Sequence, residues 1–218
     1  RGIEAEVGKL TIDPLDGLVA RNVRIFSDQT KTTLVASINN ITLDIDLLKL
    51  MRKKQFLNSV EFRDTDIYLP IDPENNESKE IKITDLKARV RVPESTIEIE
   101  NADCLLNGIK INLVGSLTQK NDANSSILKN SLSSENSEIK LKKRRNLLNS
   151  IVTEVEKINF NYKDPPEIKI KFISDLNEIE KTSATVSLEA KKISRFGSNY
   201  QINSIGLEVG NTKKVMFI

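Results

Sequence analysis

The sequence predicts a mainly β protein of the α+β class: an antiparallel, twisted or curled sheet with one short and one longer amphipathic helix. Three observations predict it. Apolar residues alternate with charged or polar ones over many short segments, which is the period of half-buried strands. Turn-forming residues separate these segments. Only two stretches, at 47–51 and from about 138, have apolar residues at helical spacing.

The first strands are expected on either side of a turn that contains Pro14 and Gly17. Proline fixes φ and glycine tolerates positive φ, so this pair favours a tight turn. The alternation of Ile3, Ala5 and Val7 predicts a strand that ends near residue 11, and strands at 18–26 and 34–46 follow. These segments have charged residues between the apolar ones, so one face of the sheet is expected to be apolar.

The next segment changes period twice. Ile41, Leu43 and Ile45 alternate with polar residues, and Asp46 then provides an N-cap for a short helix at 47–51. An extended segment resumes near residue 60 and ends at Pro70. Its apolar face shifts between residues 62 and 67, which predicts a β-bulge near residues 64 and 65.

This strand–short helix–strand unit, together with the preceding GKLTIDPLDGLVARNVRIFSD (residues 8–28), resembles the N-terminal region of bacterial AsmA-like proteins. These are relatives of the TamB and bridge-like lipid-transfer families. The features that carry the resemblance are a Gly-Leu strand, the LLKL helix and a strand that ends in Leu69-Pro70, and it is clearest over residues 8–117. The resemblance implies a non-enzymatic role in phospholipid transport or maintenance. It also implies a periplasmic location, as part of a protein anchored in the inner membrane.

Further strands between residues 81 and 113, separated at Pro93 and at Asn107-Gly108, are expected to form an antiparallel meander. We divide the chain into a β-rich region at 1–117, a flexible polar linker at 118–137 and a region at 138–218 with a helix and more antiparallel strands. The last strand stops abruptly and the chain begins with Arg1. Both features favour a piece of a longer protein, with its sheet truncated and its anchor elsewhere.

Composition excludes several functional classes. The chain has no histidine and one cysteine, which removes histidine-dependent catalytic sites, histidine-based zinc sites and an internal disulfide framework. No glycine-rich phosphate loop occurs. The net charge of +2 gives no general attraction to nucleic acid. No segment approaches the roughly 18 apolar residues of a membrane-spanning helix. We therefore expect no enzyme activity, no cofactor and no nucleic-acid partner.

The main candidate site is the apolar face of the sheet, which we expect to contact the acyl chains of phospholipid or another acyl lipid. The residues assigned to this face are Ile41, Leu43, Ile45, Val90, Ile97, Ile99, Ile109, Ile111 and Leu113. The alternative is an ordinary closed β-sandwich core. In that case the chain is a structural or interaction module that docks partner proteins of the envelope.

Three weaker candidates remain. A basic run is a candidate membrane-surface site, or else a solvated helix face: Lys140, Lys142, Lys143, Arg144 and Arg145. The pairs Asp44/Asp46 and Asp64/Asp66 offer oxygen ligands, but they resemble no known metal-binding loop and are better explained as solvated strand faces, so no metal site is assigned. Cys104 is expected to be a small buried apolar residue rather than a nucleophile.

Overall fold

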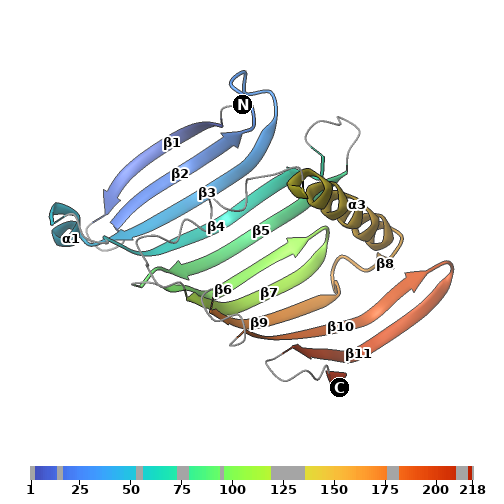
Figure 1. Cartoon of the computed structure of the whole chain (residues 1–218). Helices are drawn as coiled ribbons and strands as arrows, with labels where there is room; N and C mark the ends of the chain where they lie inside the picture. Colours follow the sequence, from blue (N-terminus) through green and yellow to red (C-terminus); the bar gives the residue numbers. More distant parts are fainter. Residues whose placement is uncertain are drawn as a thin grey trace.

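One curled β-sheet contains every described strand in the computed structural model (Figure 1). The structure describes residues 3–13, 17–52, 56–72, 79–93, 96–118, 136–175, 182–209 and 216–217. The strands follow each other across the sheet in chain order, and β8 alone pairs off this path, with β10. The mainly β class with two helices is therefore confirmed.

The strands are β1 Glu4–Asp13, β2 Gly17–Phe26, β3 Leu34–Ile45, β4 Leu57–Pro70, β5 Glu80–Arg91, β6 Thr96–Leu106, β7 Ile109–Thr118, β8 Asn159–Phe160, β9 Glu167–Asp175, β10 Ser183–Arg195, β11 Ser198–Val209 and β12 Met216–Phe217. The helices are α1 Leu47–Met51 and α3 Asn136–Glu156.

The short helix α1 begins as its sequence predicts. The Asp46 carboxylate accepts a hydrogen bond from the backbone N–H of Lys49 at 3.0 Å, which satisfies one of the free donors at a helix N-terminus. The backbone N–H of Asp46 in turn donates to the carbonyl of Phe56 at 2.7 Å, which ties the two ends of the α1 segment together. α1 therefore lies between the end of β3 and the start of β4, at the ends of these two inner strands.

One strand pairing differs from the predicted antiparallel sheet. β7 and β9 are parallel, with Leu113 opposite Ile170, whereas all the other described pairings are antiparallel. A parallel pair needs a long crossover, and α3 lies in this one. Strands from both the predicted N-terminal and C-terminal regions thus join one sheet. The predicted linker lies almost wholly outside the described residues.

α3 lies along the edge of the sheet where β4 ends and β5 begins (Figure 1). Arg145 pairs with Asp72 at 3.3 Å, and Glu156 pairs with Lys79 next to β5. Glu154 pairs with Arg195 at the end of β10. These exposed ion pairs contribute little energy each, so they orient the helix more than they stabilise it.

The predicted bulge in β4 is one of a series. In each strand from β1 to β6, the apolar positions advance once by three residues instead of two, as between Phe62 and Thr65. Asn22, Asp64 and Asp85 lie at these steps with φ of 52°, 50° and 54°, a left-handed conformation that Asn and Asp tolerate best among residues with side chains. The steps in β1 to β4 lie side by side, whereas those in β5, between Ile83 and Leu86, and in β6, between Ile99 and Ala102, are displaced along the strands. On both sides of each step the apolar residues stay on one face.

Candidate functional site

Two rows of apolar residues cross the sheet at right angles to the strands. The hydrogen-bonded register pairs each residue of a row with the next, so all side chains of a row point to the same face. Row A consists of Leu10, Ala20, Ile41, Phe62, Ala88, Ala102, Leu113, Ile170, Val186 and Leu207. Row B consists of Ile12, Leu18, Leu43, Val60, Val90, Ile99, Gly115, Phe172 and Ala184.

Two more rows lie beside them on the same face. Row C has two parts: Val7, Val23, Ile38, Thr65 and Leu86, then Cys104, Ile111, Ile168, Leu188 and Ile205. Row D consists of Ala5, Ile25, Ala36, Ile67, Ile83, Leu106 and Ile109. Side chains from rows A, C and D pack into one cluster around Val23 and Ile38, which shows that the three-residue steps do not divide the face. We call rows A to D together the apolar face.

The apolar face is long for a monomer. Ten strands about 4.8 Å apart make row A about 43 Å long. Leu43 in row B and Ala36 in row D are seven positions apart on β3, which is about 23 Å at 3.3 Å per residue. The face therefore covers about 1,000 Å² of sheet, more than the few hundred Å² of the largest apolar patch on a typical monomer.

Most of this face has no second layer over it. Among its side chains only those of Val23, Ala36, Ile38, Thr65 and Ala88 are buried, and the others are half-buried or exposed. Every described strand belongs to the one sheet, so no strand within the described ranges forms a covering layer. α3 runs beside the ends of the strands, from β4 and β5 towards β8 (Figure 1). The apolar side chains thus pack sideways against each other and leave their outer surfaces accessible.

All nine residues predicted to contact lipid lie on this face. Seven belong to rows A to D, and Ile45 and Ile97 continue the alternation of rows A and B at the strand ends. None of the nine is fully buried, and Ile97 is 44% exposed. The structure therefore brings these residues together on one surface. The sequence predicted their alternation but did not show whether other segments of the chain lie over them.

Two positions on the apolar face were not singled out from the sequence. Thr65 in row C is 1% exposed, and its hydroxyl has no hydrogen-bond partner among the described residues. Gly115 in row B faces Phe172 across the parallel pair, and a Cβ at Gly115 would collide with the carbonyl oxygen and ring of Phe172. The sequence signal was available in both cases, since each residue interrupts an otherwise apolar alternation.

Replacing Thr65 by valine is expected to raise the free energy of unfolding by about 1 kcal/mol, because it removes a buried hydroxyl that makes no hydrogen bond. Urea unfolding measured by circular dichroism would report the change. Thr185→Val, at an exposed position of β10, is the control and is expected to stay within about 0.5 kcal/mol of the parent protein. A loss of stability in Thr65→Val would mean that the hydroxyl has a partner in solution.

The opposite face is charged. Arg89 and Arg91 on β5 both pair with Glu100 on β6, at 3.3 and 3.5 Å, which is a favourable pairing of opposite charges across two strands. Three described clefts, of about 610, 730 and 600 Å³, are lined mainly by charged and polar residues of this side, including Asp44 and Glu61. The sheet is therefore amphipathic, with ion pairs on one side and hydrocarbon on the other.

A second ionic group lies at the start of the parallel pair. Lys110 on β7 pairs with Glu167 on β9 at 2.9 Å, and Lys169 contacts both Glu167 and Glu189. The hydrogen bond from Lys110 holds the pKa of Glu167 below its usual range, and the hydrogen bond to Glu167 raises the pKa of Lys169. Both shifts favour the charged forms of Glu167 and Lys169. The cluster belongs to the charged side of the sheet, because Lys110, Glu167 and Glu189 alternate with row C residues along their strands.

The basic run is only partly described. The side chains of Lys140, Lys142, Lys143 and Arg144 lie outside the described part of the chain, and Arg145 is ion-paired with Asp72. The membrane-surface role of this run stays a prediction.

The four aspartates do not form a common site. Asp44 accepts from Asn58 at 3.3 Å, Asp46 caps α1, Asp64 pairs with Lys87 at 3.7 Å, and Asp66 accepts from the backbone of Asp85 at 3.1 Å. No group of three or more His, Cys, Asp or Glu residues that could hold a metal occurs in the part of the chain that the structure describes.

Cys104 lies in row C opposite Ile111 and is half-buried. Burial, with a smaller contribution from Asp103, raises the pKa of its thiol. It is therefore protonated at neutral pH, which disfavours nucleophilic attack because the thiolate is the reactive form. Cys104 thus contributes apolar surface rather than chemistry.

The described helices include none that is both long and apolar enough to cross a membrane. The chain matches no protein-family model, no curated protein and no solved structure. The resemblance to AsmA-like proteins therefore stays a prediction that rests on the sequence pattern.

Proposed function

We propose that the apolar face binds the acyl chains of phospholipid or another acyl lipid, and that the protein is a non-enzymatic lipid-binding or lipid-transfer segment. The observation that carries the proposal is the set of four apolar rows that cross the sheet without a second layer over most of them. Rows A and B contain only apolar residues from β1 to β10. A hydrocarbon chain that lies along them meets no polar side chain of this face.

The energetic argument concerns the exposure of hydrocarbon to water. Burial of each CH₂ group is worth about 0.8 kcal/mol, so a 16-carbon chain in water costs on the order of 12 kcal/mol. A row about 43 Å long offers continuous apolar contact along the chain and removes most of this cost. Such contact requires no catalytic residue, which agrees with the absence of histidine from the sequence.

The biological setting comes from the resemblance alone. In AsmA-like proteins it would be the bacterial periplasm, within a longer protein anchored in the inner membrane and close to envelope partner proteins. On this proposal the present segment supplies part of a longer apolar path for phospholipid.

Native mass spectrometry of the gently purified protein tests the proposal. We expect additional masses that correspond to bound phospholipid or fatty acid, which disappear when a detergent exchange removes lipid. A second assay would follow the transfer of a fluorescent phospholipid from vesicles to the protein. The proposal fails if the purified protein carries no lipid and takes none from vesicles.

The alternative function is a structural module that docks envelope proteins. Three clefts on the charged side favour it, since their charged and polar lining offers groups that a partner protein could pair with. In that case Arg89→Glu, which reverses a charge in two of these clefts, would weaken the partner complex and leave lipid content unchanged. The two functions are thus separated by which face of the sheet is sensitive to substitution.

A further inference from the structure

The hairpin between β10 and β11 has an unusual turn. Phe196 and Gly197 occupy its two central positions with φ of 52° and 79°. The β6–β7 hairpin has the same kind of turn at Asn107 and Gly108, with φ of 48° and 84°. Two-residue turns with positive φ at both positions strongly favour Asn-Gly. A bulky aromatic residue in this conformation is strained and is a reason to look for a function.

Packing does not explain the phenylalanine. Phe196 is 84% exposed, and a Cβ at Gly197 would find no atom within 4 Å. The ring contacts the guanidinium group of Arg195, whose central carbon lies 4.9 Å from the ring centre. The turn therefore presents an aromatic ring to the solvent from a residue with a strained backbone, and a cation lies against one face of the ring.

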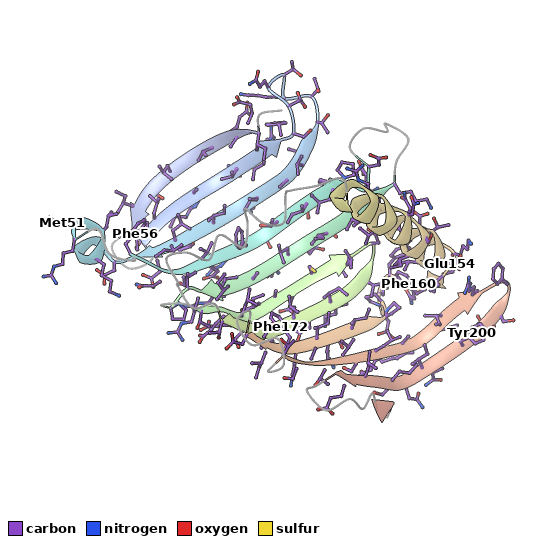
Figure 2. All side chains as sticks on the ribbon, viewed as in Figure 1. Met51, Phe56, Glu154, Phe160, Phe172 and Tyr200 are labelled. Carbon is purple, nitrogen blue, oxygen red and sulfur yellow. The ribbon has the colours of Figure 1, made fainter. Side chains whose placement is uncertain are left out.

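Other exposed aromatic residues lie at the same end of the molecule. β8 pairs with β10, with Phe160 opposite Ile193, and Tyr162 follows two residues later and is 85% exposed. Tyr200 on β11 lies opposite Ile193 of β10 and is 54% exposed. Figure 2 shows Tyr200 and Phe160 far from Met51, which is at the other end of the sheet. We call Phe196, Tyr162 and Tyr200 the aromatic tip.

The charges around the aromatic tip are predominantly positive. Five cations lie on the segments that carry the three rings, residues 157–164 and 191–200. Lys191 pairs with Asp164 at 3.1 Å, and Lys157 and Arg195 share Glu154. Lys163 and Lys192 are the other two and are exposed. Exposed aromatic rings combined with lysines are the composition found where proteins meet the headgroup region of a bilayer.

We propose that the aromatic tip docks on an anionic lipid bilayer, with the ring of Phe196 inserted among the headgroups. A protein pocket suits this end less well, because the three rings come from three separate places, the β10–β11 turn, strand β11 and the segment after β8. The proposal is independent of lipid binding by the apolar face: a bilayer-docking tip would remain if that face held no lipid.

The chain contains no tryptophan, so Phe196→Trp creates a protein with a single fluorescent probe at the aromatic tip. The matched control is Met51→Trp, since Met51 is 83% exposed and lies at the opposite end (Figure 2). Each variant is titrated with vesicles of phosphatidylcholine alone and with vesicles that contain about one third phosphatidylglycerol. Circular dichroism verifies that both variants are folded.

We expect Phe196→Trp to show a blue shift of its emission and protection from iodide quenching with the anionic vesicles, and Met51→Trp to show neither. Phe196→Asn, which restores the Asn-Gly turn, is expected to reduce vesicle co-flotation about tenfold with unchanged circular dichroism. Equal shifts in both tryptophan variants, no shift in Phe196→Trp, or a shift that depends on protein concentration without vesicles would each overturn the proposal. The last outcome would identify a second copy of this chain as the occupant.

Discussion

Two carboxylates placed on the apolar face are expected to reduce the lipid content of the purified protein at least tenfold. Ala102→Asp and Val186→Asp introduce charges into row A on β6 and β10. A carboxylate in contact with hydrocarbon loses its hydration without gaining a polar partner. This desolvation costs far more free energy than the loss of the apolar contact that the original side chain made. Both positions are half-buried, so water still reaches the charges in the lipid-free protein and the fold is expected to persist.

The control places the same two charges on the other side of the sheet. Asn101→Asp and Thr185→Asp change the chain neighbours of Ala102 and Val186. In the strand register Asn101 lies opposite Arg89, and Thr185 lies opposite Lys171. Bound phospholipid per protein, measured by native mass spectrometry or lipid extraction, should be unchanged in this control. Equal lipid loss in both double variants would trace the effect to net charge, and no loss in either would remove the apolar face as the binding site.

Replacing Gly115 by valine is expected to destabilise the protein by about 3 kcal/mol, at the upper end of what overpacking costs. The new side chain would collide with the backbone and the ring of Phe172, and neither can move without opening the parallel β7–β9 pair. That pair joins the first seven strands to the remaining ones, so the loss should appear as a lower urea midpoint.

Ser116→Val is the matched control, because it adds a β-branched residue to the same strand on the opposite face. Its effect should stay within about 0.5 kcal/mol. Phe172→Ala combined with Gly115→Val should recover part of the lost stability, since it removes the ring that blocks the valine, and the two changes will then be non-additive. Additive effects would show that the ring is not the obstacle.

The sequence-based prediction of individual strands succeeded where one face of the strand is apolar and the other polar. The alternation of Ile41, Leu43 and Ile45 located a strand and its apolar side, because a period of two has only one explanation in a half-buried strand. The bulge at Asp64 was found for the same reason. The three-residue steps at Asn22 and Asp85 were missed. In those strands charged or small residues next to the step obscure the shift in the apolar–polar alternation.

Phe196 was also missed, although a signal was present. The X-Gly pair between two predicted strands indicates a two-residue turn, but the sequence does not show whether an aromatic side chain at such a turn is packed or exposed. Its exposure depends on which segments pack nearby.

The sequence by itself determined that this protein is mainly β, that one side of its sheet is apolar and the other charged, and that the chain has no histidine. The tertiary structure decided three further points. All described strands join one sheet, β7 and β9 pair in parallel, and most of the apolar face has no covering layer. The reason is that the alternation of apolar and polar residues is a local property of the sequence. Whether a face is covered depends on which segments distant in the chain pack against it, and a local pattern contains no information about that.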